Sequence, residues 1–268
     1  PMSSLFVLVI PNIVRVDACI RFVRVTHKRP FLLLSTRPED EAAAEELASF
    51  TAGMQLEEGA IEQRRVESAP LGDVDLDAYS GVLLGGSPFN NSDEVKSQTQ
   101  LRVEREIGTL VREIIDRDFP LMGACYGIGT VGTLIGATLG DEYAEEAGLI
   151  QVALTEEGTS DPLLDGLPSS FDTLVGHKEA LSSVPSSATV LVSGAACPIQ
   201  MFRVGRNVYA TQFHPELTAE ALEFRLRLYA HLGYVPAEVM ESNIAEAYTG
   251  DFTWNNQILA NFAEMYGR

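Results

Sequence analysis

The stretch Gly123-Ala124-Cys125-Tyr126-Gly127 decides the fold, because a strand leads into it and a helix leads out of it. Residues 120–123 form a short apolar run typical of a buried strand, and the small residues of 126–135 predict a helix. The two flanking glycines let strand and helix backbones approach through a sharp turn, as in a nucleophile elbow. We expect Cys125 to point into a cleft from a helix N-terminus, where the dipole favours the thiolate. The alternative is an unreactive cysteine buried in a small-residue turn.

Strands and helices alternate in the first half of the chain outside this turn. Alternation of this kind predicts a mostly parallel sheet with helices on both faces, a three-layer α/β/α fold. Ligands of such sheets bind at the carboxyl ends of the strands, which directs attention to the residues that follow each strand. The further elements expected here are strands at 31–35 and 81–84, a helix that Pro38 opens, and a helix over 93–117 with Ser92 as its N-cap.

Short apolar runs separated by turns follow in the second half, and helices follow the runs. The runs predict strands at 149–154, 171–175, 189–192, 199–204 and 208–212, with Asn207 in a tight turn, and the helices are expected at 218–232, 237–247 and 255–266.

The segment Gln212-Phe213-His214-Pro215-Glu216 follows the last of these strands, so it also lies at a strand end. A histidine is the natural base for a cysteine thiol. A carboxylate two residues further on can orient the imidazole and stabilise its charged form. A capping or core histidine is the alternative, but two separate strand ends supply matching partners. The sequence therefore predicts a catalytic triad of Cys125, His214 and Glu216.

Three segments together resemble the signatures of class I glutamine amidotransferases, and the glutaminase domain of GMP synthase is among the most similar in style. The resemblance covers about Phe31 to Tyr229, and the segments stand in the order of that family. It implies a flavodoxin-like α/β/α fold. The segments are GVLLGGSP at 81–88, PLMGACYGIG at 120–129 and ATQFHPE at 210–216.

The resemblance also implies the role of each site residue. Cys125 would attack the γ-carboxamide carbon of a glutaminyl group, and His214, oriented by Glu216, would take the thiol proton and later protonate the departing ammonia. The backbone N–H groups of Gly86 and Tyr126 would form the oxyanion hole.

Substrate-binding residues are expected at Gly85, Ser87, Gly129 and His177, the last in the segment Gly176-His177-Lys178-Glu179. A structural role for His177 remains an alternative. Gly129 departs from the family, which usually has a glutamine there that helps to hold the substrate's α-amino and carboxylate end. This departure leaves room for a γ-glutamyl compound bulkier than free glutamine.

Composition narrows the classes of partner. The net charge of −19 disfavours nucleic acid, and no apolar run is long enough for a membrane span. Three cysteines without CxxC spacing argue against disulfides or a zinc site, so we expect no metal, no cofactor and a cytoplasmic location.

One domain preceded by an N-terminal extension is expected. Residues 1–29 carry Arg15, Arg21, Arg24, Lys28 and Arg29 against one acid, Asp17, and predict an N-terminal extension, or else an added edge strand at 5–10. Residues 30–268 predict the amidotransferase-like domain, with C-terminal helices from about 237 that cover the domain or contact a second copy.

No phosphate-binding loop is visible, so a synthetase partner would have to supply an acceptor site. Three functions stay open: a glutaminase of an amidotransferase, a stand-alone γ-glutamyl peptidase or hydrolase, and a non-catalytic binding protein on the same fold.

Overall fold

The structure, a computed structural model, describes residues 29–232 and 235–267, apart from the side chain of Leu232. The expected N-terminal extension lies, except for Arg29, outside the described residues. No described helix is both long and apolar enough to cross a membrane.

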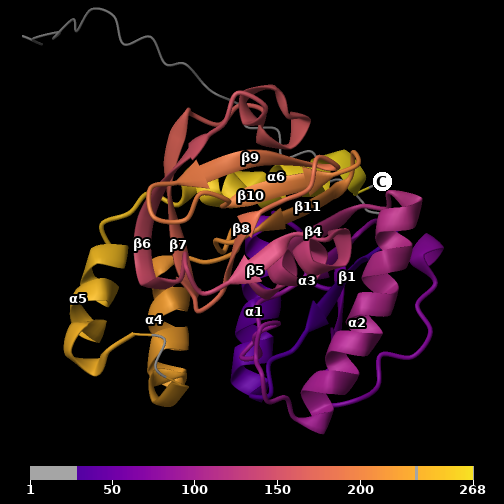
Figure 1. The fold of residues 1–268 in the computed structure, drawn as a ribbon, viewed down its shortest axis with the longest axis horizontal. Coiled ribbons are helices and arrows are strands. Elements are labelled where there is room, and N and C mark those ends of the chain that lie inside the picture. Colours follow the sequence, from indigo (N-terminus) through magenta and orange to yellow (C-terminus); the bar gives the residue numbers. More distant parts are fainter. Residues whose placement is uncertain (1–28, 233–234, 268) are drawn as a thin grey trace, which may run out of the picture.

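A nine-stranded sheet forms the centre of the molecule (Figure 1). Its order is β2-β1-β3-β4-β11-β10-β9-β6-β7, and β5 and β8 pair in a separate small sheet. The first five strands of this order are parallel to one another, whereas every pairing from β11 through β10, β9 and β6 to β7 is antiparallel. The strands are β1 Phe31–Ser35, β2 Ile61–Arg65, β3 Val82–Leu84, β4 Leu121–Ala124, β5 Thr138–Gly140, β6 Glu145–Leu154, β7 Ser170–His177, β8 Ala180–Ser183, β9 Ala188–Gly194, β10 Met201–Val204 and β11 Val208–Thr211.

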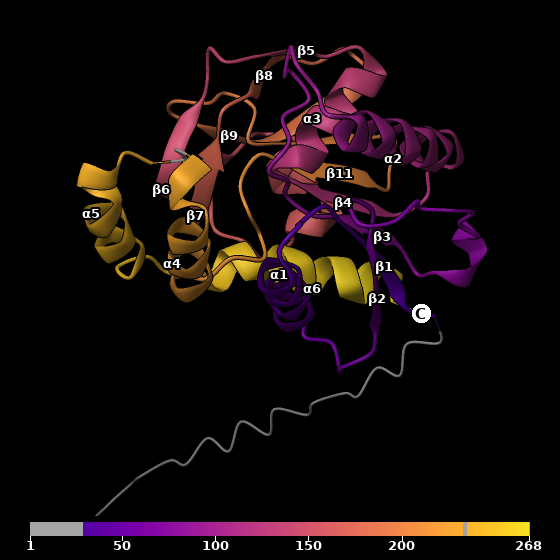
Figure 2. The same ribbon diagram turned by 90° about the horizontal axis from the view of Figure 1, so that it is seen from below.

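Helices cover both faces of the parallel half, which confirms the expected α/β/α architecture (Figure 2). Helices α2 and α3 lie on one face, and α1 and α6 lie on the other. Strand β1 shows why: Leu32 and Leu34 belong to one apolar core and Phe31 and Leu33 to a second, so both faces of the strand are buried. The helices are α1 Asp40–Gly53, α2 Gln98–Arg117, α3 Tyr126–Ile135, α4 Ala219–Leu228, α5 Ala237–Ala247 and α6 Thr253–Tyr266.

Helix α2 begins later than the sequence predicted. Its N-cap is Ser97, whose hydroxyl accepts from the N–H of Gln100, and not Ser92. Asp93 instead accepts hydrogen bonds from the backbone and side chain of Asn90, which holds 90–93 in a loop. The apolar stripe of the helix is buried and consists of Val103, Ile107, Leu110, Val111 and Ile114.

Three strands were missed by the sequence interpretation. Strand β2 reads IEQRR, and only its first residue is buried, so it lacks the apolar run of a central strand. Strands β5 and β8 are three and four residues long and pair only with each other. Short or polar edge strands give little periodic signal.

The C-terminal helix α6 packs beneath the sheet. Ile258, Leu259 and Phe262 are fully buried in the core that also contains Phe31 and Phe50. Its first turn reaches the site region, because Asn255 donates to the carbonyl of His214 at 3.0 Å and Asn256 to that of Pro215 at 2.7 Å. Contact with a second copy stays a prediction.

Candidate active site

Cys125 occupies the sharp turn between β4 and α3. Its φ of 53° and ψ of −91° lie in a region that non-glycine residues rarely adopt, and this strain is typical of functional positions. A Cβ on Gly123 would lie 3.1 Å from the Cα of Gly127, so the turn needs glycine at its start. The N–H of Cys125 donates to the carbonyl of Thr211 at 2.8 Å, which ties the turn to β11. The thiol contacts the carbonyl oxygen of Gly176 at 4.0 Å.

His214 and Glu216 follow β11, the neighbour of β4 in the sheet. Nδ1 of His214 lies 2.8 Å from Oε1 of Glu216, and Nη1 of Arg225 donates to the same oxygen at 3.0 Å. All three side chains are buried. The structure thus brings the three residues of the expected triad together and adds a guanidinium group behind the carboxylate.

Electrostatic interactions in this cluster shift the pKa values of both His214 and Glu216. Burial alone would lower the pKa of His214, but Glu216 and Cys125 outweigh it and raise that pKa to about 9. Burial would raise the pKa of Glu216, but His214 and Arg225 outweigh it and lower that pKa to about 2. These shifts favour the imidazolium form of His214 and the carboxylate form of Glu216 at neutral pH.

The two expected oxyanion donors flank the site, Tyr126 directly after the cysteine and Gly86 beside the histidine. Tyr126 is the first residue of α3, so its N–H is one of the donors that a helix leaves without an intrahelical partner. At Gly86 a Cβ would come within 2.6 Å of Nη2 of Arg37 and 2.9 Å of Cε1 of His214. Only glycine lets the loop after β3 approach the histidine this closely.

A second buried ion pair supports the same loop. Nε of Arg37 lies 3.1 Å from Oε1 of Glu46, and the hydroxyl of Ser35 donates to Oε2 at 2.7 Å. A Cβ on Gly85 would lie 2.4 Å from Oε1 of Glu46, so Gly85 packs on this carboxylate.

His177 lies in a different hydrogen-bond network. Its Nε2 is 2.9 Å from Oε2 of Glu145, and its Nδ1 is 3.0 Å from the backbone oxygen of Glu179. Gln200 also donates to Oε2 of Glu145, at 2.7 Å. Both ring nitrogens of His177 are therefore engaged within the protein.

The same network contains a group of metal-ligand types. One ligand atom each from Glu145, His177 and Cys197 lies within 4.8 Å of the others. Burial raises the pKa of the Cys197 thiol to about 11, and His177 and Glu145 are bonded to one another, so the atoms already have partners and the thiol is protonated. The chemistry of this set does not favour a metal.

Gly129 leaves a space that two other side chains fill. A Cβ there would lie 2.7 Å from Nδ2 of Asn91 and 3.0 Å from Oε1 of Glu179. Glu179 in turn accepts from the N–H groups of Asn91 and Ser92, at 2.9 and 2.7 Å. The loop after β3 is thus fastened to the residues that follow β7.

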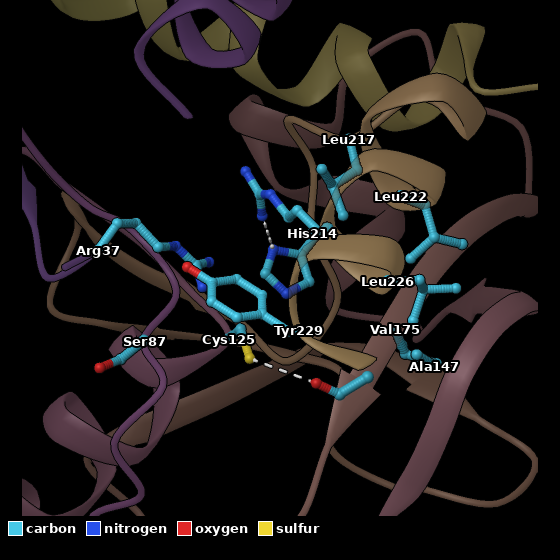
Figure 3. Close-up of a pocket in the computed structure, with 12 residues that line it drawn as sticks. Arg37, Ser87, Cys125, Ala147, Val175, His214, Leu217, Leu222, Leu226 and Tyr229 are labelled. Carbon is cyan, nitrogen blue, oxygen red and sulfur yellow. Dashed lines mark hydrogen bonds between the residues drawn. The ribbon is translucent and has the colours of Figure 1, made fainter. Parts of the chain in front are cut away.

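Cys125 lines two hollows. Figure 3 shows the first of them, here called the His214 pocket. The His214 pocket is lined by Cys125, His214, Ser87, Gly176, Arg37, Arg225, Tyr229 and five aliphatic residues. The Tyr126 pocket is lined by Cys125, Tyr126, Ser87, Phe89, Asn90, Gly176, His177, Glu179 and Gln212.

Sequence reasoning missed Arg225, Arg37 and Glu46. Arg225 lies nine residues after Glu216 on α4, in a helix with no motif of its own. In the sequence these three residues are visible only as charged side chains near predicted strand ends or in helices. Such side chains are usually solvated, so they gave no indication of a buried role.

Comparison with known proteins gives a consistent result. The family model "Glutamine amidotransferase class-I" matches residues 54–225. One glutamine-hydrolysing GMP synthase subunit, from Thermoplasma acidophilum, is 28% identical over 144 residues, which span 53% of this chain and 66% of that protein. The glutamine-hydrolysing GMP synthase of Neisseria meningitidis is 27% identical over 150 residues, 56% of this chain but 26% of that protein. The chain therefore matches about a quarter to two thirds of these relatives' lengths.

Solved structures share the fold. A glutamine amidotransferase of Thermotoga maritima superposes with a TM-score of 0.72 at 14% identity, over 90% of this chain and 100% of that one. One from Methylobacillus flagellatus gives 0.67 at 16% identity, over 91% and 97%.

Proposed function

Since the chain belongs to the class I glutamine amidotransferase family and is an enzyme of that type, we propose that it hydrolyses a γ-glutamyl amide through a thioester on Cys125. The observation that carries the proposal is the strained turn at Cys125 beside the 2.8 Å pair of His214 and Glu216. A structural cysteine needs neither the strain nor a charged histidine.

The reaction has two halves. The sulfur of Cys125 bonds to the γ-carbonyl carbon, the carbonyl oxygen becomes an oxyanion held by the N–H groups of Gly86 and Tyr126, and His214 bears the proton. The C–N bond then breaks as His214 gives this proton to the leaving nitrogen, and a γ-glutamyl thioester remains. Water attacks the thioester with His214 as base, the C–S bond breaks, and γ-carboxylate and thiol are released.

The positive charge of His214 is maintained by its neighbours. Glu216 orients the ring through Nδ1, and Arg225 fixes Glu216 in turn. This leaves Nε2 as the nitrogen that exchanges protons with sulfur, leaving group and water.

Covalent labelling tests this proposal. A diazo-ketone analogue of glutamine should modify Cys125, located by peptide mass spectrometry, and Cys125→Ser should abolish the modification. Cys197 is an internal control, because it is fully buried and its pKa is raised to about 11. Labelling of Cys197 in place of Cys125, or of neither between about pH 6 and 9, would contradict the proposal.

The likeness to a protein named as one part of a GMP synthase supports a synthetase partner as the ammonia acceptor. A stand-alone hydrolase needs no such partner. The shape of the site bears on this choice, because a site built for ammonia release needs little room for the leaving group.

A further inference from the structure

Cys125 stands between two hollows of different character. The Tyr126 pocket and the His214 pocket share Cys125, Ser87 and Gly176, so they meet at the sulfur. An amide bound at the sulfur has two halves, the acyl group and the amine, and each must extend into one of the two hollows.

The position of the general acid assigns the halves. The leaving nitrogen must lie beside the group that protonates it, and His214 lines only one of the two pockets. The amine therefore extends into the His214 pocket and the glutamyl half into the Tyr126 pocket. Oε1 of Gln212 suits the glutamyl ammonium, since it lines the latter pocket and is a buried acceptor without a partner among the described residues.

The His214 pocket is larger than ammonia requires, and its wall is mostly apolar. Leu217, Leu222 and Leu226 lie on the side of His214 away from Arg37 (Figure 3). Ala147 and Val175 complete this aliphatic wall. Ammonia would contact none of it, whereas an aliphatic side chain on the leaving amine would be removed from water there.

The opposite side of the pocket carries positive charge. Arg37 is 5% exposed and is held by Glu46 through Nε, with its guanidinium 5.8 Å from the centre of the Tyr229 ring. Its Nη2 lies beside Gly86, where an added Cβ would also meet Cε1 of His214. If the leaving amine carries a carboxylate on its α-carbon, that carboxylate would lie close to Nη2 of Arg37.

We infer that the His214 pocket binds the leaving amine as an α-amino acid with an apolar side chain. The preferred substrates are then γ-glutamyl dipeptides with an apolar second residue, and free glutamine is a poor substrate. This inference rests on the proposed thioester mechanism and names its substrate class.

The test compares kcat/KM for γ-glutamyl-leucine, γ-glutamyl-aspartate and glutamine with the purified chain. We expect γ-glutamyl-leucine to exceed each of the others by about tenfold or more, the range that one buried aliphatic group confers on specificity. In Leu226→Ala the ratio of γ-glutamyl-leucine to glutamine should fall about tenfold. A ratio measured on one preparation does not depend on the fraction of folded protein.

Leu259→Ala is the matched control, because Leu259 is equally buried but lies on α6, away from both pockets. This variant should lose stability and keep the ratio. Glutamine turned over as fast as γ-glutamyl-leucine, or an unchanged ratio in Leu226→Ala, would overturn the inference and leave the thioester mechanism standing. Failure to turn over any of the three, together with no labelling of Cys125, would overturn both.

Discussion

Two buried histidines border the same cysteine, each beside a glutamate, and only one has a nitrogen free for chemistry. His214 is 2.8 Å from Glu216 and His177 is 2.9 Å from Glu145. The second nitrogen of His177 meets the backbone oxygen of Glu179, whereas that of His214 faces the pocket with Cys125. A histidine–carboxylate pair therefore does not by itself identify a catalytic base. Whether the histidine can act as a base depends on what the ring nitrogen facing away from the carboxylate contacts.

The groups behind the two carboxylates differ as well. Arg225, a cation, backs Glu216, and Gln200, a neutral amide, backs Glu145. The guanidinium of Arg225 stabilises the ionised form of the buried His214–Glu216 pair. The His177–Glu145 pair is a hydrogen bond that links β7 to β6.

The largest expected contrast is in rate. His214→Asn should lower kcat/KM for a γ-glutamyl substrate by about 10²–10⁴-fold, because it removes the group that carries the proton. His177→Asn should lower it by less than about tenfold, equivalent to 1.36 kcal/mol, because that ring only positions its neighbours. Steady-state assays measure both, with circular dichroism to verify folding. Equal losses in the two variants would show that His177 shares the chemistry.

A second contrast concerns the free energy of unfolding. Arg225→Met should lower it by about 3–5 kcal/mol, because it breaks the buried ion pairs that Arg225 makes with Glu216 and Glu45. Gln200→Met should lower it by about 1–3 kcal/mol, the cost of one lost hydrogen bond to Glu145. Urea denaturation measures both, and a Gln200→Met loss as large as that of Arg225→Met would remove the distinction between the pairs.

A smaller effect is the dependence of stability on pH. The pKa of His214 is raised to about 9 in the fold, so its contribution is fully present below its unfolded pKa of 6.5 and is lost as pH rises through 9. We expect a loss of up to about 3 kcal/mol over this interval.

The contribution of Glu216 to stability depends on pH in the opposite direction. Its pKa is lowered to about 2, so its contribution is present above 4.5 and is lost as pH falls toward 2. Stability from this pair should therefore be greatest between about pH 4.5 and 6.5. Urea denaturation across pH 6–9 should show the loss in the wild type and a flatter profile in His214→Asn. A wild-type profile as flat as that of the variant would contradict the assigned shift.

Local sequence patterns predicted the centre of the fold well and its edges poorly. Buried central strands such as Phe31–Ser35 are continuous apolar runs, and Tyr126–Ile135 was bounded correctly because glycines flank it. Strand β2 lacks an apolar run, and the start of α2 was misplaced because Ser97, not Ser92, caps the helix while Asp93 holds a loop with Asn90. In the site, the strand-end motifs indicated Cys125 and His214, whereas Arg225 reaches it from α4 and Arg37 from the loop after β1, neither in a motif of its own.

The amides of Asn255 and Asn256 have a consequence for the order in which the protein matures. They hold the carbonyls of His214 and Pro215, and they belong to the first turn of α6, some forty residues later in the chain. A ribosome that has released His214 and Glu216 has therefore not yet released the side chains that fix their backbone. During synthesis the carbonyls of His214 and Pro215 gain these two hydrogen bonds only once α6 has been made.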